Sequence, residues 1–207
     1  FPDNHFDLAI VDPPYGMKKN TYGSGSKGVK AEFDCSIENH REWDIAPKQE
    51  YFIELQWVSK NQMIFGANYF IENITNSNSS WRIAWDKDNT GDFADCELAW
   101  CSFKTSVRQF KWRWNGMLQQ NMKDKQKRIH PTEKPYELYE WILKKYAEPN
   151  FNILDTHLGS GSIAIGLDRV NKLEKMNLTL TACELKPKYY KNAINRIEEK
   201  TKWESLF

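Results

Sequence analysis

Short apolar runs that stop at proline, glycine or charged residues, separated by segments with helical spacing, are the feature that most constrains how this chain folds. Such runs are typical of strands buried on both faces of a parallel sheet, and they cover residues 6–11, 62–65, 151–154 and 178–183. Helices are predicted between them, at a segment opened by Pro47 and at residues 136–147, 163–171 and 189–200. This alternation predicts an α/β fold with a doubly wound, mostly parallel sheet and helices on both faces.

The middle of the chain has a different pattern. Residues 81–86, 97–103 and 106–114 are rich in Trp, Phe and Val, which predicts further strands joined by polar turns. Residues 20–28 are rich in Gly and Ser and are expected to form a mobile loop. With 207 residues, the chain fits a single domain (1–207) that carries a modest insertion.

Composition excludes several classes of protein. Hydrophobic residues make up 40% and charged residues 28% of the chain, as in ordinary globular proteins. No apolar stretch approaches the roughly 18 to 20 residues that a membrane span needs, and no signal peptide is recognised. The four cysteines form no C-x-x-C pair and the histidines lack ligand spacing, so we expect free thiols in a reducing cytoplasm and no metal.

Charge is unevenly distributed although the net charge is only +1. Residues 104–130 contain eight Lys and Arg against one acid, Asp124, whereas residues 86–97 are acidic. A local basic stretch is typical of a protein that holds a polyanion at one face. It is equally typical of a solvated loop, and charge alone does not separate the two.

Asp12-Pro13-Pro14-Tyr15 follows the first predicted strand directly. Ligands of open α/β sheets bind at the carboxyl ends of strands, so a reacting group belongs here. The Asp12 carboxylate and the Pro13 carbonyl, whose direction proline restricts, could each accept one hydrogen of a planar aromatic amine and expose the nitrogen lone pair. Tyr15 offers a flat face for a base flipped out of a duplex. The alternative is a Pro-Pro turn, which the rarity of this tetrapeptide disfavours.

Residues 155–162 (DTHLGSGS) join a predicted strand to a predicted helix. Its glycines allow close approach of the backbone to a ligand, but the Gly-Lys-Ser/Thr of a phosphate loop and the G-x-G-x-x-G of a dinucleotide site are both missing. Alone, the turn is as consistent with a tight connection as with a cofactor site. Glu184 ends the next strand, where an acid can bind ribose hydroxyls. A cofactor with a ribose and no phosphate, such as S-adenosylmethionine, fits both features.

Two further segments are open to two interpretations each. In HPTEKP at 130–135, spacing alone favours Thr132 as a helix cap. In the 110–114 segment aromatic and basic residues alternate, which suits either contact with nucleic acid or a half-buried strand with Trp112 inward.

Together these segments resemble the DNA amino-methyltransferases, which methylate the exocyclic amine of adenine or cytosine. DPPY at 12–15 matches their catalytic motif, HPTEKP is similar to their H-P-T-[QE]-K-P segment, and DTHLGSGS resembles D-P-F-x-G-S-G-T. The CELKPKYYKNAINRI run at 183–197 is similar to their acidic-strand and helix pattern. The order, with the catalytic motif first, is that of the circularly permuted beta group. Thr156 and His157 depart from the usual Pro and Phe.

The resemblance implies residue roles, partners and a cellular setting. It assigns catalysis to Asp12, Pro13, Pro14 and Tyr15. It assigns S-adenosylmethionine to Asp155, Leu158, Gly159, Ser160, Gly161, Ser162, Glu184, Thr132 and Lys134, which overrides the cap interpretation. Double-stranded DNA with a flipped base is the expected substrate, bound by Lys104, Arg108, Lys111, Trp112, Arg113 and Arg128. It also implies a role in DNA methylation, such as restriction-modification, for a bacterial or phage-encoded protein in the cytoplasm, and it is compatible with a homodimer.

The family places target recognition just before HPTEKP, here about residues 104–129. So short an insertion presents few base-reading side chains, which predicts a short or relaxed target site. DPPY favours adenine, and methylation of the cytosine N4 amine is the nearest alternative. A catalytically silent nucleic-acid-binding subunit, or methylation of RNA or of a glutamine side chain, are the other candidates.

Overall fold

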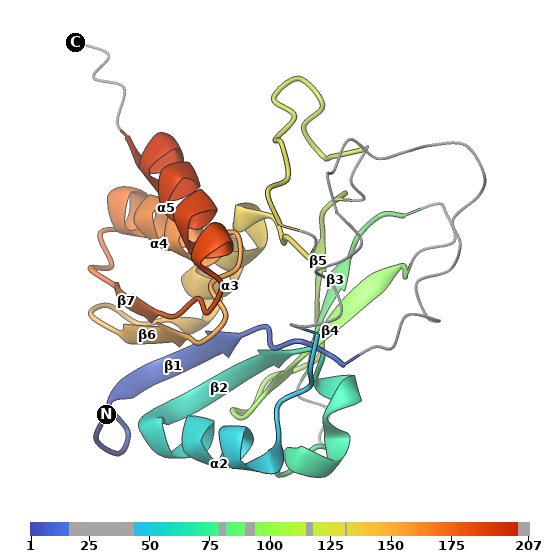
Figure 1. The fold of residues 1–207 in the computed structure, drawn as a ribbon, viewed down its shortest axis with the longest axis vertical. Coiled ribbons are helices and arrows are strands. Elements are labelled where there is room, and N and C mark those ends of the chain that lie inside the picture. Colours follow the sequence, from blue (N-terminus) through green and yellow to red (C-terminus); the bar gives the residue numbers. More distant parts are fainter. Residues whose placement is uncertain (17–43, 79–81, 90–93, 115–117, 131, 203–207) are drawn as a thin grey trace.

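The computed structural model describes residues 1–16, 44–78, 82–89, 94–114, 118–130 and 132–202 (Figure 1). Within them, seven strands form one sheet in the order β5-β3-β4-β2-β1-β6-β7. The strands are β1 (Phe6–Val11), β2 (Ser59–Phe65), β3 (Arg82–Asp86), β4 (Cys96–Cys101), β5 (Arg108–Lys111), β6 (Asn152–Asp155) and β7 (Thr179–Ala182). Only β4 runs antiparallel to its neighbours, β2 and β3, so the sheet is mostly parallel.

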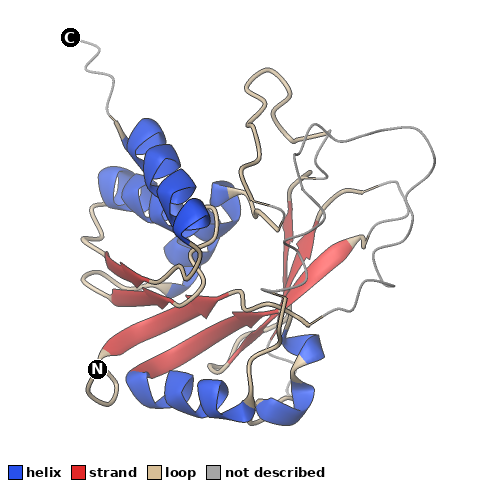
Figure 2. Cartoon of the chain, in the orientation of Figure 1, coloured by secondary structure: helices blue, strands red, loops and turns tan. Residues whose placement is uncertain are grey.

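Helices cover both faces of the sheet (Figure 2). They are α2 (Gln49–Val58), α3 (Tyr136–Tyr146), α4 (Ser162–Glu174) and α5 (Pro187–Thr201), with two 3₁₀ turns, η1 (Ala67–Tyr69) and η2 (Ile71–Asn73). Figure 1 shows α2 beneath the sheet and α3, α4 and α5 above it. Among the described residues, no helix combines the length and the apolar character that a membrane span requires.

The central strand β1 supplies side chains to two hydrophobic cores. Leu8 and Ile10 pack in the core that contains α3 and α4 residues, while Ala9 and Val11 pack in the core that contains α2 residues. Because successive side chains of a strand point to opposite faces, a strand buried on both sides must be apolar throughout. The continuous apolar run FDLAIV therefore follows from its central position in the sheet.

The sheet has a topological switch point between β1 and β6. These neighbours pair in parallel, with Leu8 opposite Ile153. Among the described residues, the helix that follows β1 is α2, on one face of the sheet, and the helix that follows β6 is α4, on the other (Figure 1). Connections that diverge in this way leave a crevice at the carboxyl ends of the two strands, where ligands bind in open α/β folds.

The fold agrees with the predicted α/β class, and most element bounds differ from the sequence prediction by only a few residues. The helix expected at Pro47 begins at Gln49, and the expected strand over 106–114 is limited to Arg108–Lys111. The cap interpretation of Thr132, which spacing alone favoured and the family resemblance overrode, is excluded, because α3 begins after Pro135 without a side-chain cap. The predicted loop over 20–28 lies outside the described residues.

Candidate active site

The segments after β1 and β6 meet at the switch point. Asp12 follows β1 directly and Asp155 is the last residue of β6, while Ala9 pairs with Leu154 between these two parallel strands. The structure thus brings DPPY and the glycine turn to one edge of the sheet, as their sequence positions predicted. Both acids are largely buried there.

Both oxygens of the Asp12 carboxylate accept a hydrogen bond. The Tyr15 hydroxyl donates to Oδ1 at 2.8 Å, and the Lys134 ammonium donates to Oδ2 at 2.6 Å. Burial raises the pKa of Asp12, and the charge of Lys134 opposes that effect without cancelling it. Each carboxylate oxygen has a second lone pair, so the group can still accept a hydrogen from a further donor.

Lys134 is shared with a second acid, Glu97 on β4. Its Nζ lies 2.8 Å from Glu97 Oε2, and only 3% of the Lys134 side chain is exposed. Glu97 also pairs with Lys87. Burial by itself raises the pKa of Glu97, but the charges of Lys134 and Lys87 outweigh burial and lower it to about 2. Glu97 belongs to a run of acids with no motif around it, so its sequence did not mark it as a site residue.

Aromatic rings surround Tyr15. The Tyr69 ring stacks on it at 4.8 Å between centroids with an interplanar angle of 16°. Gly66 lies directly against the Tyr15 ring, because a Cβ built on Gly66 would be 2.1 Å from Tyr15 Cε1. One face of Tyr15 is therefore covered by Tyr69, which is itself half exposed. A flipped base could not stack on that face of Tyr15 while Tyr69 covers it.

The glycine turn has the backbone that its sequence suggested. Gly159 and Gly161 adopt φ of 55° and 76°, a region that other residues avoid. The Gly159 amide donates to Glu184 Oε2 at 3.0 Å, which places the predicted ribose-binding acid beside the turn. Ser162 Oγ donates to the Lys134 carbonyl at 2.6 Å, so the turn is tied to the residue that holds Asp12.

A buried arginine on α5 holds the turn in place. Arg196 Nη1 donates to the Ser160 carbonyl at 2.9 Å and to Ser162 Oγ at 3.0 Å. Its Nη2 lies 3.3 Å from Glu133 Oε1, and both side chains are almost fully buried. In the sequence, Arg196 stands out only as part of the family-like pattern at 183–197. Its burial cannot be predicted from neighbouring residues, because a charged residue on a helix is usually exposed.

Asp155 and His157 have strongly perturbed pKa values. Burial raises the pKa of Asp155 to about 7, and the charges of Asp12 and Glu184 add to the rise, although the His157 amide bonds its Oδ1 at 2.9 Å. Burial lowers the pKa of His157 to about 4, so its ring is neutral at pH 7. His157 Nδ1 lies 2.9 Å from Thr156 Oγ1. The two residues that depart from the family pattern therefore bond to each other.

Thr132 and His130 lie beside the glycine turn. Thr132 Oγ1 is 3.2 Å from His130 Nδ1, and a Cβ built on Gly159 would be 3.8 Å from the His130 ring. HPTEKP thus borders the turn at His130 and reaches Asp12 through Lys134. Pro131 lies outside the described residues.

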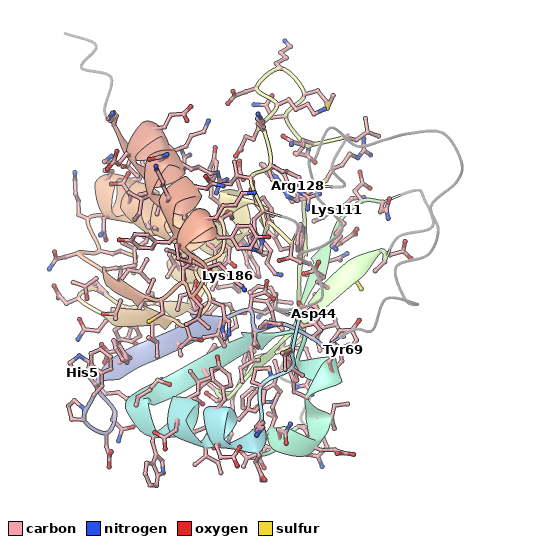
Figure 3. The ribbon with its side chains drawn as sticks, in the orientation of Figure 1. His5, Asp44, Tyr69, Lys111, Arg128 and Lys186 are labelled. Carbon is pink, nitrogen blue, oxygen red and sulfur yellow. The ribbon has the colours of Figure 1, made fainter. Side chains whose placement is uncertain are left out.

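The predicted DNA-binding residues occupy β5 and the segments around it. Trp112 is half buried against the core, its ring stacks on Phe110 at 5.9 Å, and its carbonyl accepts a bond from Trp85 Nε1. This favours the inward orientation of Trp112. Lys111 and Arg113 both pair with Asp88. Lys104 and Arg108 are exposed and Arg128 is half buried; in the view of Figure 3, Lys111 and Arg128 lie in the same upper region of the molecule.

Comparison with known proteins gives the following matches. Residues 40–195 match the sequence model of a family described as DNA methylase. Three solved structures resemble the fold. M1.HpyAVI in complex with S-adenosylmethionine matches with a TM-score of 0.55 and 20% identity, over 93% of this chain and 89% of that chain. A putative DNA modification methylase from Thermus thermophilus, complexed with S-adenosylmethionine, matches with a TM-score of 0.54 and 15% identity, over 100% of this chain and 91% of that chain. PvuII DNA methyltransferase, cytosine-N4-specific, matches with a TM-score of 0.54 and 12% identity, over 97% of this chain and 86% of that chain. A search of curated proteins finds no match.

Proposed function

Because the chain belongs to the N6/N4 DNA methylase family, we propose that it transfers a methyl group from S-adenosylmethionine to the exocyclic amine of adenine in DNA. One observation carries the proposal. The Asp12 carboxylate, at the carboxyl end of β1, is linked through Lys134 to the glycine turn that follows β6. The proposed amine acceptor and the proposed cofactor turn thus lie at the same switch point of the sheet.

The residues around the turn fit a cationic cofactor with a ribose. Asp12 and Glu184 each place a carboxyl group near Asp155, and their charges contribute to the raised pKa of Asp155. A positively charged ligand would offset these charges. Bound S-adenosylmethionine would supply the electrophilic methyl group. The residues proposed to bind it are Asp155, Leu158, Gly159, Ser160, Gly161, Ser162, Glu184, Thr132 and Lys134.

Asp12 and Pro13 prepare the target amine. An exocyclic amine is a poor nucleophile because its lone pair is delocalised into the ring. Hydrogen bonds from its two N–H groups to the Asp12 carboxylate and the Pro13 carbonyl draw the nitrogen toward tetrahedral geometry. The methylated nitrogen then loses one of its protons to give the neutral product. Pro14 restricts the backbone that presents Pro13, and Tyr15 contributes ring surface and the hydroxyl that orients Asp12.

DNA contact is proposed for the segment over residues 104–129, as a small target-recognition insertion of the single domain. Its candidate phosphate-binding and base-contacting residues are Lys104, Arg108, Lys111, Trp112, Arg113 and Arg128. The inward orientation of Trp112 leaves mainly the cations to contact phosphate, and such contacts carry little sequence information. This supports the expectation of a short or relaxed target site.

The choice of adenine rests on the DPPY sequence, and cytosine N4 is the alternative. Incubation of the purified chain with S-adenosylmethionine carrying a labelled methyl group tests both. The substrates are matched duplexes, one containing all four bases and one in which 2-aminopurine, which has no 6-amino group, replaces adenine. Nucleoside analysis of the product should show N6-methyladenine from the first duplex and no label in the second. N4-methylcytosine would overturn the adenine assignment, and absence of transfer to any duplex would favour the silent binding subunit.

A further inference from the structure

A chain of alternating charges runs from Lys87 to the carboxylate proposed to bind the amine. Lys87 pairs with Glu97, Glu97 pairs with Lys134 at 2.8 Å, and Lys134 pairs with Asp12 at 2.6 Å. The side chains come from four separate segments, since Asp12 follows β1, Lys87 follows β3, Glu97 lies on β4 and Lys134 precedes α3. Burial of charged side chains costs desolvation free energy, so four charged groups in one row indicate a role other than packing.

Lys134 sits at the centre of the chain of charges and is fixed on several sides. Its ammonium lies 4.9 Å from the centroid of the Phe65 ring, and 3% of its side chain is exposed. Its ammonium donates a hydrogen bond to Asp12 Oδ2 and forms an ion pair with Glu97 Oε2 at 2.8 Å. Two carboxylates therefore compete for one cation within the site.

We propose that Glu97 is a positioning residue for methyl transfer, which holds the Lys134 ammonium between two carboxylates so that Lys134 orients Asp12 without neutralising it. The proposal rests on the proposed function of Asp12. If the Lys134 ammonium paired with Asp12 alone, its charge would offset that of the Asp12 carboxylate. The carboxylate would then be a weaker acceptor for the hydrogen of the target amine. Glu97 draws part of that positive charge away and adds negative potential near Asp12, which strengthens acceptance of the amine hydrogen.

The charged groups around Asp12 determine in which direction Glu97 shifts the pKa of Asp12. Ionisable groups face Asp12 from several neighbouring segments: Tyr15, Tyr51, Glu97, Lys134, Tyr139 and Asp155, with Lys87 behind Glu97. The charge of Glu97 raises the pKa of Asp12, and the charge of Lys134 lowers it. Removal of either partner should therefore shift the titration of Asp12, and the two shifts should have opposite signs.

Glu97→Gln tests the proposal in the reaction. The substitution keeps the shape and removes the charge, so kcat should fall about tenfold or more, while the Kd of S-adenosylmethionine stays within about threefold of the unmodified chain. The acidic limb of the kcat profile should move to lower pH. The matched control is Glu140→Gln, which removes an acid paired with Lys144 and Arg169 and should leave kcat unchanged. Unchanged kcat in Glu97→Gln would overturn the proposal.

A double-mutant cycle tests whether Glu97 acts through Lys134. In a Lys134→Met background, Glu97→Gln should lower kcat by less than about threefold, because its partner is already gone. If the losses of the two single variants multiply in the double variant, Glu97 acts by another route and the proposal fails.

A titration that needs no catalysis separates this inference from the proposed function. Carbon-13 NMR of the Asp12 carboxyl should give a lower pKa in Glu97→Gln and a higher pKa in Lys134→Met than in the unmodified chain. Equal values in all three chains, or shifts of the same sign, would overturn the proposal. Failure of the proposed function would show instead as absence of methyl transfer by the unmodified chain, with the opposite NMR shifts still present.

Discussion

Asp155 should destabilise the folded chain at neutral and alkaline pH, and Asp155→Asn should remove that effect. Only 3% of Asp155 is exposed, and burial followed by the charges of Asp12 and Glu184 raises its pKa from 3.8 to about 7. Asparagine carries no charge and keeps an Oδ1 acceptor for the His157 amide, which Asp155 now accepts at 2.9 Å.

The size and sign of the effect follow from proton linkage. The unfolded chain loses the Asp155 proton near pH 4, whereas the folded chain retains it to about pH 7. Stability contributed by the protonated acid is therefore present below pH 4 and is lost as pH rises to about 7. A difference of about 3 pKa units corresponds to about 4 kcal/mol, an upper bound because the new amide group of asparagine also needs a partner.

Urea denaturation followed by tryptophan fluorescence measures this effect at several pH values. The free energy of unfolding of Asp155→Asn should match that of the unmodified chain near pH 4 and exceed it by up to about 4 kcal/mol at pH 8. Saturating S-adenosylmethionine should narrow the gap at pH 8, since a cation stabilises the ionised Asp155. A difference that does not depend on pH, or a variant less stable at pH 8, would refute the electrostatic account of this site.

Three other substitutions have defined outcomes. Gly66→Ala introduces a Cβ 2.1 Å from the Tyr15 ring at a φ of 65°, so methyl transfer should fall at least about tenfold with S-adenosylmethionine affinity retained in calorimetry; normal transfer would show that the ring is not fixed there. Arg196→Met removes the ion pair between Arg196 and the buried Glu133 and should lower the free energy of unfolding by about 3 kcal/mol in urea. A loss under about 1 kcal/mol would contradict a stabilising role for this ion pair. A buried neutral histidine with its pKa lowered to about 4 destabilises the folded chain as pH falls from 6.5 to 4. The free energy of unfolding of His157→Phe, relative to the unmodified chain, should therefore rise as pH falls between these two values in urea titrations. A difference that does not change with pH would contradict this.

The sequence predicted most elements because central strands and amphipathic helices have strong local patterns. FDLAIV at residues 6–11 is apolar throughout, as a strand buried on both faces must be. The position of β4, antiparallel between β2 and β3, could not be derived, because strand order depends on contacts between distant segments. The two 3₁₀ turns after Gly66 were also missed, since such short turns carry little periodicity.

The candidate site was predictable where its residues share a motif and was missed where they do not. Asp12 and Gly159 both stand in short motifs next to strands, and the structure brings those motifs to one edge of the sheet. Glu97, the second residue of β4, belongs to no motif, and Arg196, within α5, was noted only as part of the pattern at 183–197. The importance of both arises from partners on other elements of the fold. Lys134 was recognised, but its contact with Asp12 spans 122 residues and was not foreseen.

Asp12→Asn tests the central claim most directly, through paired measurement of methyl transfer in a single turnover and of S-adenosylmethionine binding by calorimetry. Asparagine preserves the shape of the side chain but lacks the negative charge that draws the amine hydrogen. Methyl transfer to duplex DNA should therefore fall at least about a hundredfold, while the Kd of S-adenosylmethionine changes less than about threefold. Transfer within tenfold of the unmodified chain, or a loss of cofactor affinity as large as the loss of transfer, would contradict the role of Asp12 as the acceptor of the target amine.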